Sequence, residues 1–220
     1  IFLMLMLKKP LLLEGPPGVG KTEVANIVAN YKGHELIRLQ CYEGLDVSTS
    51  VYEWNYQKQL LHIKLNEKEN ISAQEQEKVI FSDEFLLKRP LLKAITSDKP
   101  AVLLLDEIDR ADEEFEAFLL ELLSDFQISI PELGTIKAKH KPVVILTSNR
   151  TRDLSDALKR RCLYHWVDFP TFDKELAILE KRVGGEVEML QQLVKFIEYL
   201  RGQNLQKTPG IAETIDWARA

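Results

Sequence analysis

The chain has 220 residues, enough for one well-buried α/β domain and a small appendage. With 45% hydrophobic and 29% charged residues, the composition is that of a globular protein and excludes the disordered, collagen-like and disulfide-scaffold classes. The formal net charge of -5 argues against a protein whose whole surface binds nucleic acid.

The chain begins with an apolar run, Ile1 to Leu7, which is followed by Lys8, Lys9 and Pro10. This run is far shorter than the roughly 20 apolar residues of a membrane-spanning helix, and no basic segment precedes it as in a signal peptide. We therefore expect no membrane span and a cytoplasmic location. Because the chain opens inside this run and closes inside a helical pattern, we also expect both ends to be cut from something longer.

Apolar runs typical of strands alternate with stretches of helical period from end to end, as in βαβ units with a mainly parallel sheet. Five strands are predicted, near residues 10–14, 34–40, 100–105, 143–148 and 163–168. The sequence therefore predicts an α/β fold.

Three segments between these strands have patterns of their own. Residues 63–81 are polar and without a period, which predicts an exposed and mobile insertion. Residues 112–124 carry apolar side chains at helical spacing, which predicts an amphipathic helix. Residues 126–142 predict a β-hairpin with its turn at residues 131–134.

Pro170 marks the expected boundary between two domains. Residues 1–170 are predicted to form the α/β domain, and residues 171–220 carry helical patterns that predict a small, incomplete all-α domain. In the second domain, Thr208 and Pro209 are predicted to be the N-cap and the first residue of the last helix.

The sequence predicts no structural zinc site. Cys41 and Cys162 lack the CxxC spacing of zinc ligands, and the four histidines follow no ligand pattern. In an intracellular protein, two such thiols are expected to be buried and free. His165, in the last predicted strand, is expected to be a satisfied structural imidazole.

A phosphate-binding loop is predicted between the first strand and the helix that follows it. The octet Gly-Pro-Pro-Gly-Val-Gly-Lys-Thr has the glycine, lysine and threonine spacing of such loops. Glycines let main-chain N–H groups turn toward phosphate oxygens, and the following helix adds its positive end. Lys21 would reach the β and γ phosphates, and Thr22 would be a ligand of Mg²⁺. The predicted nucleotide-binding residues are Gly15, Pro16, Pro17, Gly18, Val19, Gly20, Lys21, Thr22 and Glu23.

Two acids follow the strongly apolar strand near residues 100–105. Asp106 and Glu107 would lie at the carboxyl edge of the sheet, where open α/β sheets bind ligands. Asp106 is predicted to hold Mg²⁺ through water, and Glu107 to be the base that polarises the water attacking the γ-phosphate. The alternative is that both acids cap the next helix, but the phosphate-binding loop favours the catalytic interpretation. The acidic run continues, and most of the acids in it are expected only to solvate the helix start or to favour its dipole. They are Asp109, Asp112, Glu113 and Glu114.

Two further segments hold candidates for contact with the γ-phosphate. Ser148 and Asn149 follow the fourth predicted strand, either as ordinary turn formers or, in the case of Asn149, as a sensor that orients water and phosphate. Arg160 and Arg161 end a short helix, where cations favour the helix dipole in any case. The alternative is an arginine finger that reaches a neighbouring subunit's nucleotide, for which Arg161 is the stronger candidate.

These motifs together resemble those of AAA+ ATPases. The resemblance rests on Gly15 to Thr22, Asp106-Glu107, Asn149 and the Arg160-Arg161-Cys162 ending, and it covers the chain to about residue 168. Within that superfamily the chain resembles the MoxR branch. It is most similar to the CoxD-like group, associated with maturation of carbon monoxide dehydrogenase and related molybdenum hydroxylases, in residues 38–46, 109–115 and 209–219.

The resemblance implies a P-loop NTPase domain with sheet order 5-1-4-3-2 and a helical lid. It implies Mg²⁺-dependent ATP hydrolysis and ring assembly, expected to be hexameric, with nucleotide between subunits. The implied partners are a protein with a von Willebrand factor A domain and a client metalloenzyme, a molybdenum/copper hydroxylase of the carbon monoxide dehydrogenase type.

One position departs from this family. MoxR-type lids usually place an arginine just after a Ser-Pro that opens a late helix, where it touches the γ-phosphate. Here Thr208-Pro209 is followed by Gly210, which carries no charge. No residue is therefore assigned to lid sensing, and Lys207 is only a weak substitute.

Three functions remain open. The first is an ATP-hydrolysing chaperone that remodels a client metalloenzyme or an adaptor. The second is a nucleic-acid motor or clamp-loader-like ATPase, because the hairpin carries a compact basic cluster, which protection of an edge strand explains equally well. That cluster consists of Lys137, Lys139, His140 and Lys141. The third is a scaffold in which ATP assembles the ring and little hydrolysis occurs. Gly210 motivates this alternative.

Overall fold

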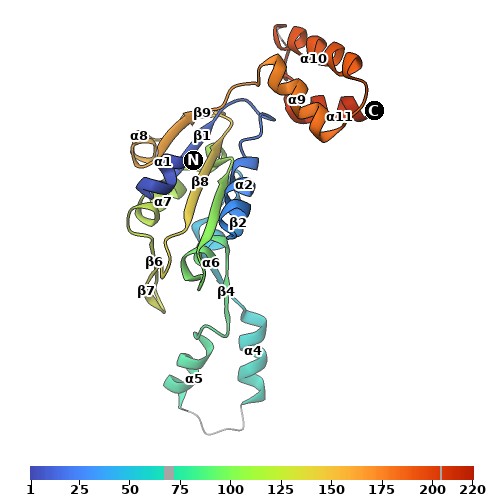
Figure 1. Cartoon of the computed structure of the whole chain (residues 1–220). Helices are drawn as coiled ribbons and strands as arrows, with labels where there is room; N and C mark the ends of the chain where they lie inside the picture. The colour runs from blue at the N-terminus through green and yellow to red at the C-terminus, as the bar shows by residue number, and fades with distance from the viewer. Residues whose placement is uncertain (67–71, 204) are drawn as a thin grey trace.

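The computed structural model describes residues 1–66, 72–203 and 205–220. Its centre is a five-stranded parallel sheet with helices on both faces (Figure 1). The strand order is β2-β5-β8-β1-β9, which confirms the order that the resemblance implied. The strands are β1 (Leu11–Glu14), β2 (Glu35–Gln40), β5 (Ala101–Asp106), β8 (Val143–Ser148) and β9 (Leu163–Trp166).

Side chains of the central strands β1, β5 and β8 alternate between two apolar cores, one on each face of the sheet. On one face, Leu11 and Leu13 pack in a core with residues of α1 (Phe2–Leu7) and α2 (Glu23–Lys32). On the other face, Leu12 belongs to a larger core. That core includes residues of α6 (Pro90–Thr96), α7 (Glu113–Asp125) and α8 (Asp156–Arg161). Burial on both faces explains why the central strands read as continuous apolar runs.

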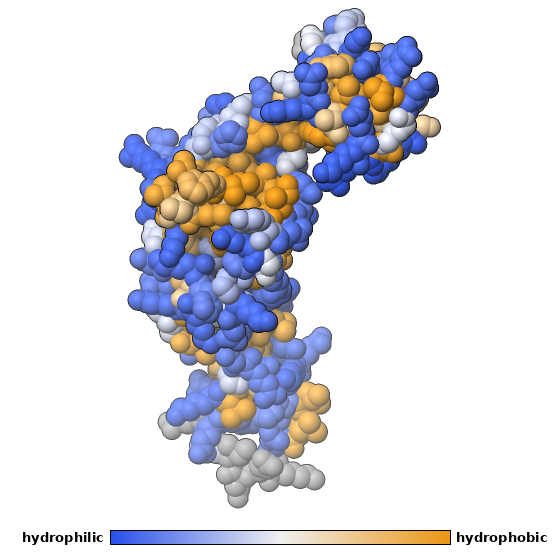
Figure 2. All heavy atoms as spheres, in the orientation of Figure 1, coloured by the Kyte–Doolittle hydropathy of each residue, from blue (hydrophilic) through white to orange (hydrophobic). Residues whose placement is uncertain are grey.

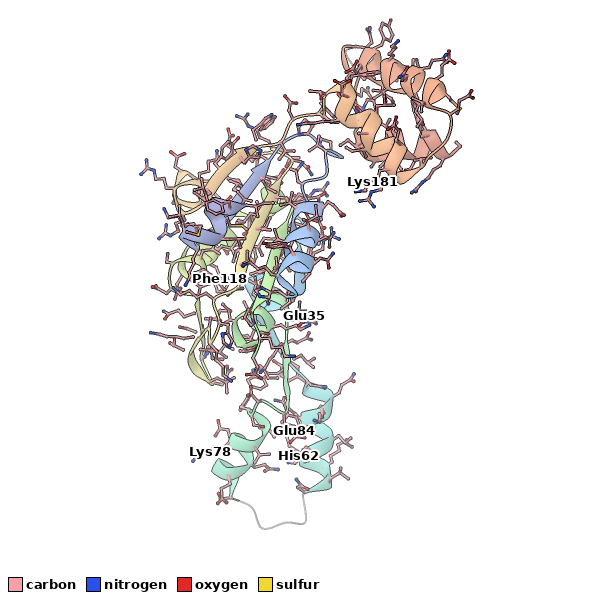
Figure 3. The ribbon with its side chains drawn as sticks, viewed as in Figure 1. Glu35, His62, Lys78, Glu84, Phe118 and Lys181 are labelled. Carbon is pink, nitrogen blue, oxygen red and sulfur yellow. The ribbon has the colours of Figure 1, made fainter. Side chains whose placement is uncertain are left out.

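The segment between β2 and β5 forms an arm that projects from the body (Figure 1). Its base is α3 (Val47–Val51) and an antiparallel pair, β3 (Tyr52–Trp54) with β4 (Leu86–Lys88). Its outer part is α4 (Tyr56–Leu65) and α5 (Ala73–Ile80). Glu35 at the start of β2 lies on the body, whereas His62, Lys78 and Glu84 lie on the arm (Figure 3).

The arm corrects part of the prediction for residues 63–81. Among residues 63–66, 72 and 75–81 none is buried, in keeping with the predicted exposure, but helices α4 and α5 make much of the segment helical rather than unpatterned. Helix α5 begins with a capping box, in which Ser72 Oγ accepts from the main-chain N–H of Glu75 at 3.3 Å. The Ser-x-x-Glu spacing that signals this start is present in the sequence. Residues 67–71 lie outside the described residues, and the mobility expected of the insertion stays a prediction.

The predicted helix over 112–124 and the predicted hairpin after it are both confirmed. Helix α7 is capped by Asp112, whose Oδ1 accepts from the main-chain N–H of Phe115 at 2.8 Å. It ends at Phe126, which has a left-handed backbone with φ 51°. The hairpin pairs β6 (Gln127–Ile130) with β7 (Gly134–Lys137) in antiparallel fashion.

Three helices at the carboxyl end pack around a small core of their own and lie apart from the sheet (Figure 1). They are α9 (Phe172–Arg182), α10 (Val187–Arg201) and α11 (Ile211–Arg219). The last helix begins at Ile211 with Gly210 as its N-cap, so the predicted start at Thr208 and Pro209 is wrong. The carbonyl of Pro209 accepts from Arg201 Nε at 2.9 Å, which holds this residue outside the helix.

A buried ion pair joins these three helices. Arg201 of α10 donates from its two terminal nitrogens to Glu175 of α9 at 2.6 and 2.8 Å. Thr214 of α11 donates its hydroxyl to the same carboxylate at 2.7 Å. The Glu175 side chain is 0% exposed, so both partners are shielded from solvent screening.

We expect Glu175→Ala to lower the free energy of unfolding by about 3–5 kcal/mol, because it leaves Arg201 buried without its partner. Urea unfolding followed by circular dichroism measures the change. The matched control is Glu198→Ala on the exposed side of α10, for which about 0.5 kcal/mol or less is expected. A similar small loss in both variants would show that the ion pair does not hold the helices together.

Apolar side chains also gather on parts of the surface. Figure 2 shows such regions over α1 and, separately, over the carboxyl-terminal helices. Phe2, Met6 and Trp217 are among the exposed apolar residues there. Within the part of the chain that the structure describes, no helix combines the length and the apolar character needed to cross a bilayer.

Both cysteines are free thiols. Cys41 is buried and Cys162 is half-buried. Burial raises the pKa of each to about 12, with the nearby charge of Asp106 adding to the effect at Cys41. A raised pKa keeps a thiol protonated near neutral pH, so both are poor nucleophiles.

Candidate active site

The loop after β1 wraps around the amino end of α2 and needs glycine at specific positions. A Cβ at Gly15 would lie 2.0 Å from the carbonyl oxygen of Val167, so no side chain fits there. Gly20 has φ 91°, a backbone conformation that favours glycine, and a Cβ there would meet nothing within 4 Å. The loop is therefore tight against the end of the sheet at Gly15 and open at Gly20.

Lys21 folds back over this loop. Its Nζ donates to the carbonyl oxygens of Gly15 at 2.8 Å and Pro16 at 2.7 Å, and to Asn149 Oδ1 at 2.9 Å. Burial lowers the pKa of Lys21, and the negative charges of Asp109, Asp106 and Glu107 oppose that shift. The ammonium thus lies where the loop, the end of β5 and the end of β8 meet.

Asp106 is the buried centre of this meeting point. Its carboxylate accepts from the Thr22 hydroxyl at 3.0 Å and from the hydroxyl of Thr147, the last residue but one of β8. Its other oxygen forms an ion pair with Arg38 of β2. Three segments distant in sequence therefore converge on one carboxylate.

Glu107 follows in a left-handed backbone conformation with φ 55°. Its main-chain N–H donates to Thr147 Oγ1 at 2.9 Å, which fixes the turn. Its carboxylate pairs with Arg110 Nε at 2.9 Å, and both side chains are partly exposed. A non-glycine residue held with positive φ is strained, and such strain is commonly found at functional sites.

Asp109 is buried, unlike an acid that only solvates a helix start, which was the expectation for most of this acidic run. Its carboxylate accepts from the main-chain N–H groups of Asn149 at 3.1 Å and Thr151 at 2.8 Å, and from the Thr151 hydroxyl at 2.7 Å. It therefore positions the segment that carries Asn149. Asp112, by contrast, caps α7 as described above.

Two cavities flank the tip of the loop. The first, of about 330 Å³, is lined by the loop, by the ends of β5 and β8, and by one residue of α11. Its lining residues are Pro17, Gly18, Gly20, Lys21, Thr22, Glu23, Asp106, Glu107, Thr147, Asn149 and Ala212. The structure thus brings most of the predicted phosphate, metal and catalytic positions to one cavity.

The second cavity, of about 510 Å³, is largely apolar and lies between the loop tip, the segment after β9, and helices α9 and α11. Its lining residues are Val19, His165, Trp166, Val167, Asp168, Phe169, Pro170, Thr171, Lys174, Ala177, Ile178 and Ile211. The exposed His165 faces it rather than being a satisfied structural imidazole. Sequence reasoning missed this cavity, because its walls come from segments that carry no motif.

Three predicted site residues do not belong to the cluster around Lys21 and Asp106. Glu23 lines the first cavity, but its half-exposed carboxylate pairs with Arg182 of α9 at 3.3 Å. Arg160 and Arg161 at the end of α8 are exposed and line neither cavity of their own chain. Arg161 Nε donates to Ser124 Oγ at the end of α7, at 2.7 Å.

Arg38 and Thr147 are site residues that the sequence motifs did not reveal. Thr147 was predicted only as part of a strand, although a hydroxyl in an otherwise apolar run is a readable signal. Arg38 is a cation within a predicted strand, and only the pairing of β2 with β5 shows that it reaches Asp106.

Gly210 is the point at which α11 touches the phosphate-binding loop. The main-chain N–H of Ile211 donates to the Gly18 carbonyl at 3.0 Å. A Cβ at position 210 would lie 2.8 Å from Gly18 Cα and 2.8 Å from the Pro17 carbonyl oxygen. This contact leaves no room for a side chain at position 210.

We expect Gly210→Ala to displace α11 and to weaken nucleotide binding roughly 5- to 100-fold, because forcing a methyl group into filled space costs about 1–3 kcal/mol. Calorimetric titration with ATP measures the affinity. The matched control is Gly202→Ala, where the nearest atom to the new Cβ is Tyr199 O at 3.4 Å. Equal affinity in the two variants would show that the contact with the loop has no part in binding.

Comparison with known proteins agrees with this geometry. The sequence profile described as "ATPase family associated with various cellular activities (AAA)" matches residues 11–167, more than half of the chain. Uncharacterised proteins of Staphylococcus epidermidis and Staphylococcus aureus are both 29% identical to it, over 226 and 208 residues. The two alignments cover 97% and 91% of this chain and 78% and 71% of the relatives.

Among solved structures, a candidate ATPase from Cytophaga hutchinsonii matches with a TM-score of 0.56 and 19% identity. The match covers 98% of this chain, which spans only 54% of that one, and it bears on the fold alone. The profile match takes in the loop, both acids after β5 and the end of β8. The chain therefore belongs to the ATPase family associated with various cellular activities, a membership that implies ATP hydrolysis as its general activity.

Proposed function

We propose that the chain is a Mg²⁺-dependent ATPase of the MoxR type that remodels a client protein. The observation that carries the proposal is the convergence of Lys21, Thr22, Asp106, Glu107 and Asn149 on one cavity beside a phosphate-binding loop. These side chains supply a cation, hydroxyl and carboxylate oxygens, and a second carboxylate that can act as a base once it leaves its ion pair with Arg110. Together they meet the requirements of phosphoryl transfer to water.

The donor set suits Mg²⁺. Thr22 Oγ1 and Asp106 Oδ1 lie 3.0 Å apart, and hydroxyl and carboxylate oxygens are the hard ligands that this ion takes. Thr22 and Asp106 would hold the ion, Asp106 through water, and the ion would neutralise charge on the β and γ phosphates. Arg38 occupies the other oxygen of Asp106, which keeps that carboxylate oriented toward the cavity.

The remaining side chains have distinct roles in the proposed reaction. Lys21 exchanges its contacts with the carbonyls of Gly15 and Pro16 for phosphate oxygens, and it stays adjacent to Asn149. Asn149, positioned by Asp109, orients the terminal phosphate and the attacking water. Glu107 leaves its ion pair with Arg110 and accepts the proton of that water.

We further propose that residues 1–170 act as the nucleotide-binding domain and residues 171–220 as its lid. The apolar 510 Å³ cavity between them would take the adenine base, since it adjoins the phosphate cavity across the loop tip. Closure of the lid on the loop at Gly210 then encloses the nucleotide.

We propose ring assembly, with a hexamer expected, in which Arg161 completes the site of the adjacent subunit. The proposed client is a molybdenum/copper hydroxylase of the carbon monoxide dehydrogenase type, with a von Willebrand factor A domain protein as partner. Support for these partners is the resemblance of residues 38–46, 109–115 and 209–219 to the CoxD-like group.

A scaffold that assembles on ATP but turns it over slowly is the second candidate function. One observation favours it: among the described residues, the lid contributes only Ala212 to the phosphate cavity and no charged group. A lid without a cation contributes no charge to stabilise the transition state.

Steady-state phosphate release and particle mass, measured with and without ATP, test the proposal and separate the two candidates. A remodelling ATPase assembles with ATP and turns it over, and Lys21→Ala abolishes both. Assembly with negligible turnover in the presence of the purified client would favour the scaffold. Absence of ATP uptake by the intact protein would reject both functions.

A further inference from the structure

A cavity of about 370 Å³ lies at the opposite end of the sheet from the phosphate-binding loop. Its wall is formed where strands begin: Pro10 precedes β1, His34 precedes β2, Pro100 precedes β5 and Val143 starts β8. The turn after α1, the end of α2 and the segment after the hairpin complete it. It is therefore separate from the proposed nucleotide site.

This cavity is strongly basic. Five lysines and two histidines line it, and no aspartate or glutamate is among its described lining residues. The basic residues are Lys8, Lys9, Lys32, His34, Lys139, His140 and Lys141. The chain as a whole carries a net charge of -5, so the cavity is a positively charged region on a protein that is negatively charged overall. A concave surface lined by one sign of charge attracts ligands of the opposite sign.

Most of these charges lack a compensating partner. Lys139 pairs with Asp98 at 2.7 Å, and Lys141 lies 5.2 Å from the centre of the Phe126 ring. Lys8, Lys9 and Lys32 form no ion pair with any residue that the structure describes. Clustered like charges repel one another, and a bound anion would relieve that repulsion.

One histidine of the same wall has an unsatisfied side-chain nitrogen. His34 Nδ1 is buried and has no hydrogen-bond partner among the described residues. An unsatisfied buried nitrogen costs free energy, and such groups in folded proteins usually have a partner.

We propose that this cavity binds a small organic phosphate. The lysines and His34 would hold the phosphate group, and the apolar part of the wall, which includes Met4, Leu5 and Phe126, would cover the organic part. The volume lies near the lower limit of small-molecule sites, roughly 300 to 1,000 Å³. A compact cavity of mixed polarity suits such a ligand better than an extended nucleic-acid backbone, which requires a basic stripe.

The test uses Lys21→Ala in the full chain, because this substitution removes phosphate binding at the nucleotide loop. Phenyl phosphate and inorganic phosphate are titrated by calorimetry. We expect one phenyl phosphate per chain, bound more tightly than inorganic phosphate because of the apolar wall. At a concentration of about 100 times Kd, the Tm is expected to rise by roughly 5 to 10 °C.

Lys9→Gln and Lys32→Gln, added together, are expected to weaken binding of phenyl phosphate roughly 10-fold or more, since two charge-assisted contacts are lost. Both lysines are exposed, so the fold should persist, and Tm without ligand checks this. Lys195→Gln on α10 is the matched control and is expected to leave the affinity unchanged.

Three results would overturn the proposal. One is no saturable binding of either phosphate by the Lys21→Ala protein. Another is the same affinity with and without Lys9 and Lys32. The third is that phenyl phosphate does not bind but duplex DNA does, and that the double variant loses DNA binding. This result would make the surface a nucleic-acid contact.

Discussion

Glu107→Gln is expected to leave ATP binding intact and to lower turnover roughly 10²- to 10⁴-fold, the usual contribution of a general base. Glutamine preserves the shape of the side chain and its place beside the phosphate cavity but accepts no proton from water. The strained turn should survive, because its main-chain N–H still donates to Thr147. The loss should therefore appear in kcat rather than in affinity.

Phosphate release and calorimetric titration with ATP separate these two quantities. Glu113→Gln is a suitable control, since Glu113 lies in the first turn of α7 and lines neither cavity beside the loop. Turnover of Glu107→Gln within about twofold of the unaltered protein would remove Glu107 from the proposed reaction, and the base would have to be sought among other groups near Asn149.

The parts of the fold that follow from local sequence were predicted well. Strands β1, β5 and β8 are apolar runs in a sheet that is buried on both faces, and each ends in a polar residue, Glu14, Asp106 or Ser148. Parallel strands bring their carboxyl ends to one edge. The sheet topology thus brings Thr22, Asp106 and Asn149 together at that edge. The positions of the motifs after their strands predict this arrangement.

Features that depend on pairing between distant segments could not be predicted in this way. Arg38 reaches Asp106 across 68 residues of sequence because β2 pairs with β5 in a register that sets Gln40 opposite Asp106. A strand shifted by one residue would turn Arg38 to the other face. Nothing in the local pattern of β2 fixes that register.

Asp109 illustrates a second limit. In the sequence it is one of several acids before α7, and such residues are usually exposed to solvent. In the structure, the short 3₁₀ turn Ile108–Arg110 carries it inward to the main chain of Asn149 and Thr151. Its role depends on three hydrogen bonds that only the packed structure defines.

Arg161→Ala is expected to lower turnover roughly 10³-fold or more in the assembled ring, because an arginine finger neutralises charge that develops in the transition state. In one chain, Arg161 lies at the end of α8 and lines neither cavity beside the loop. Leu158, fully buried, anchors that helix to the core and so fixes where the guanidinium projects. In the proposed assembly, the effect would therefore operate between subunits.

Arg160→Ala is the matched control, since the two arginines are adjacent and both exposed. Arg161 alone contacts Ser124, an interaction that would orient its guanidinium. We expect a small effect from Arg160→Ala, and we expect neither substitution to change the slow turnover of protein diluted below its assembly concentration. A larger loss from Arg160→Ala would transfer the finger role to that residue.

Mixed rings give the decisive measurement. Glu107→Gln subunits retain Arg161 and bind ATP but lack the proposed base, whereas Arg161→Ala subunits have an intact site of their own but lack the finger. Each protein alone is expected to be inactive, but mixing creates interfaces at which an intact Arg161 faces an intact site, so turnover should partly return. If mixed rings form, as mass measurement would show, and turnover stays absent, then Arg161 does not act across the interface and its contact with Ser124 serves only the fold of its own chain.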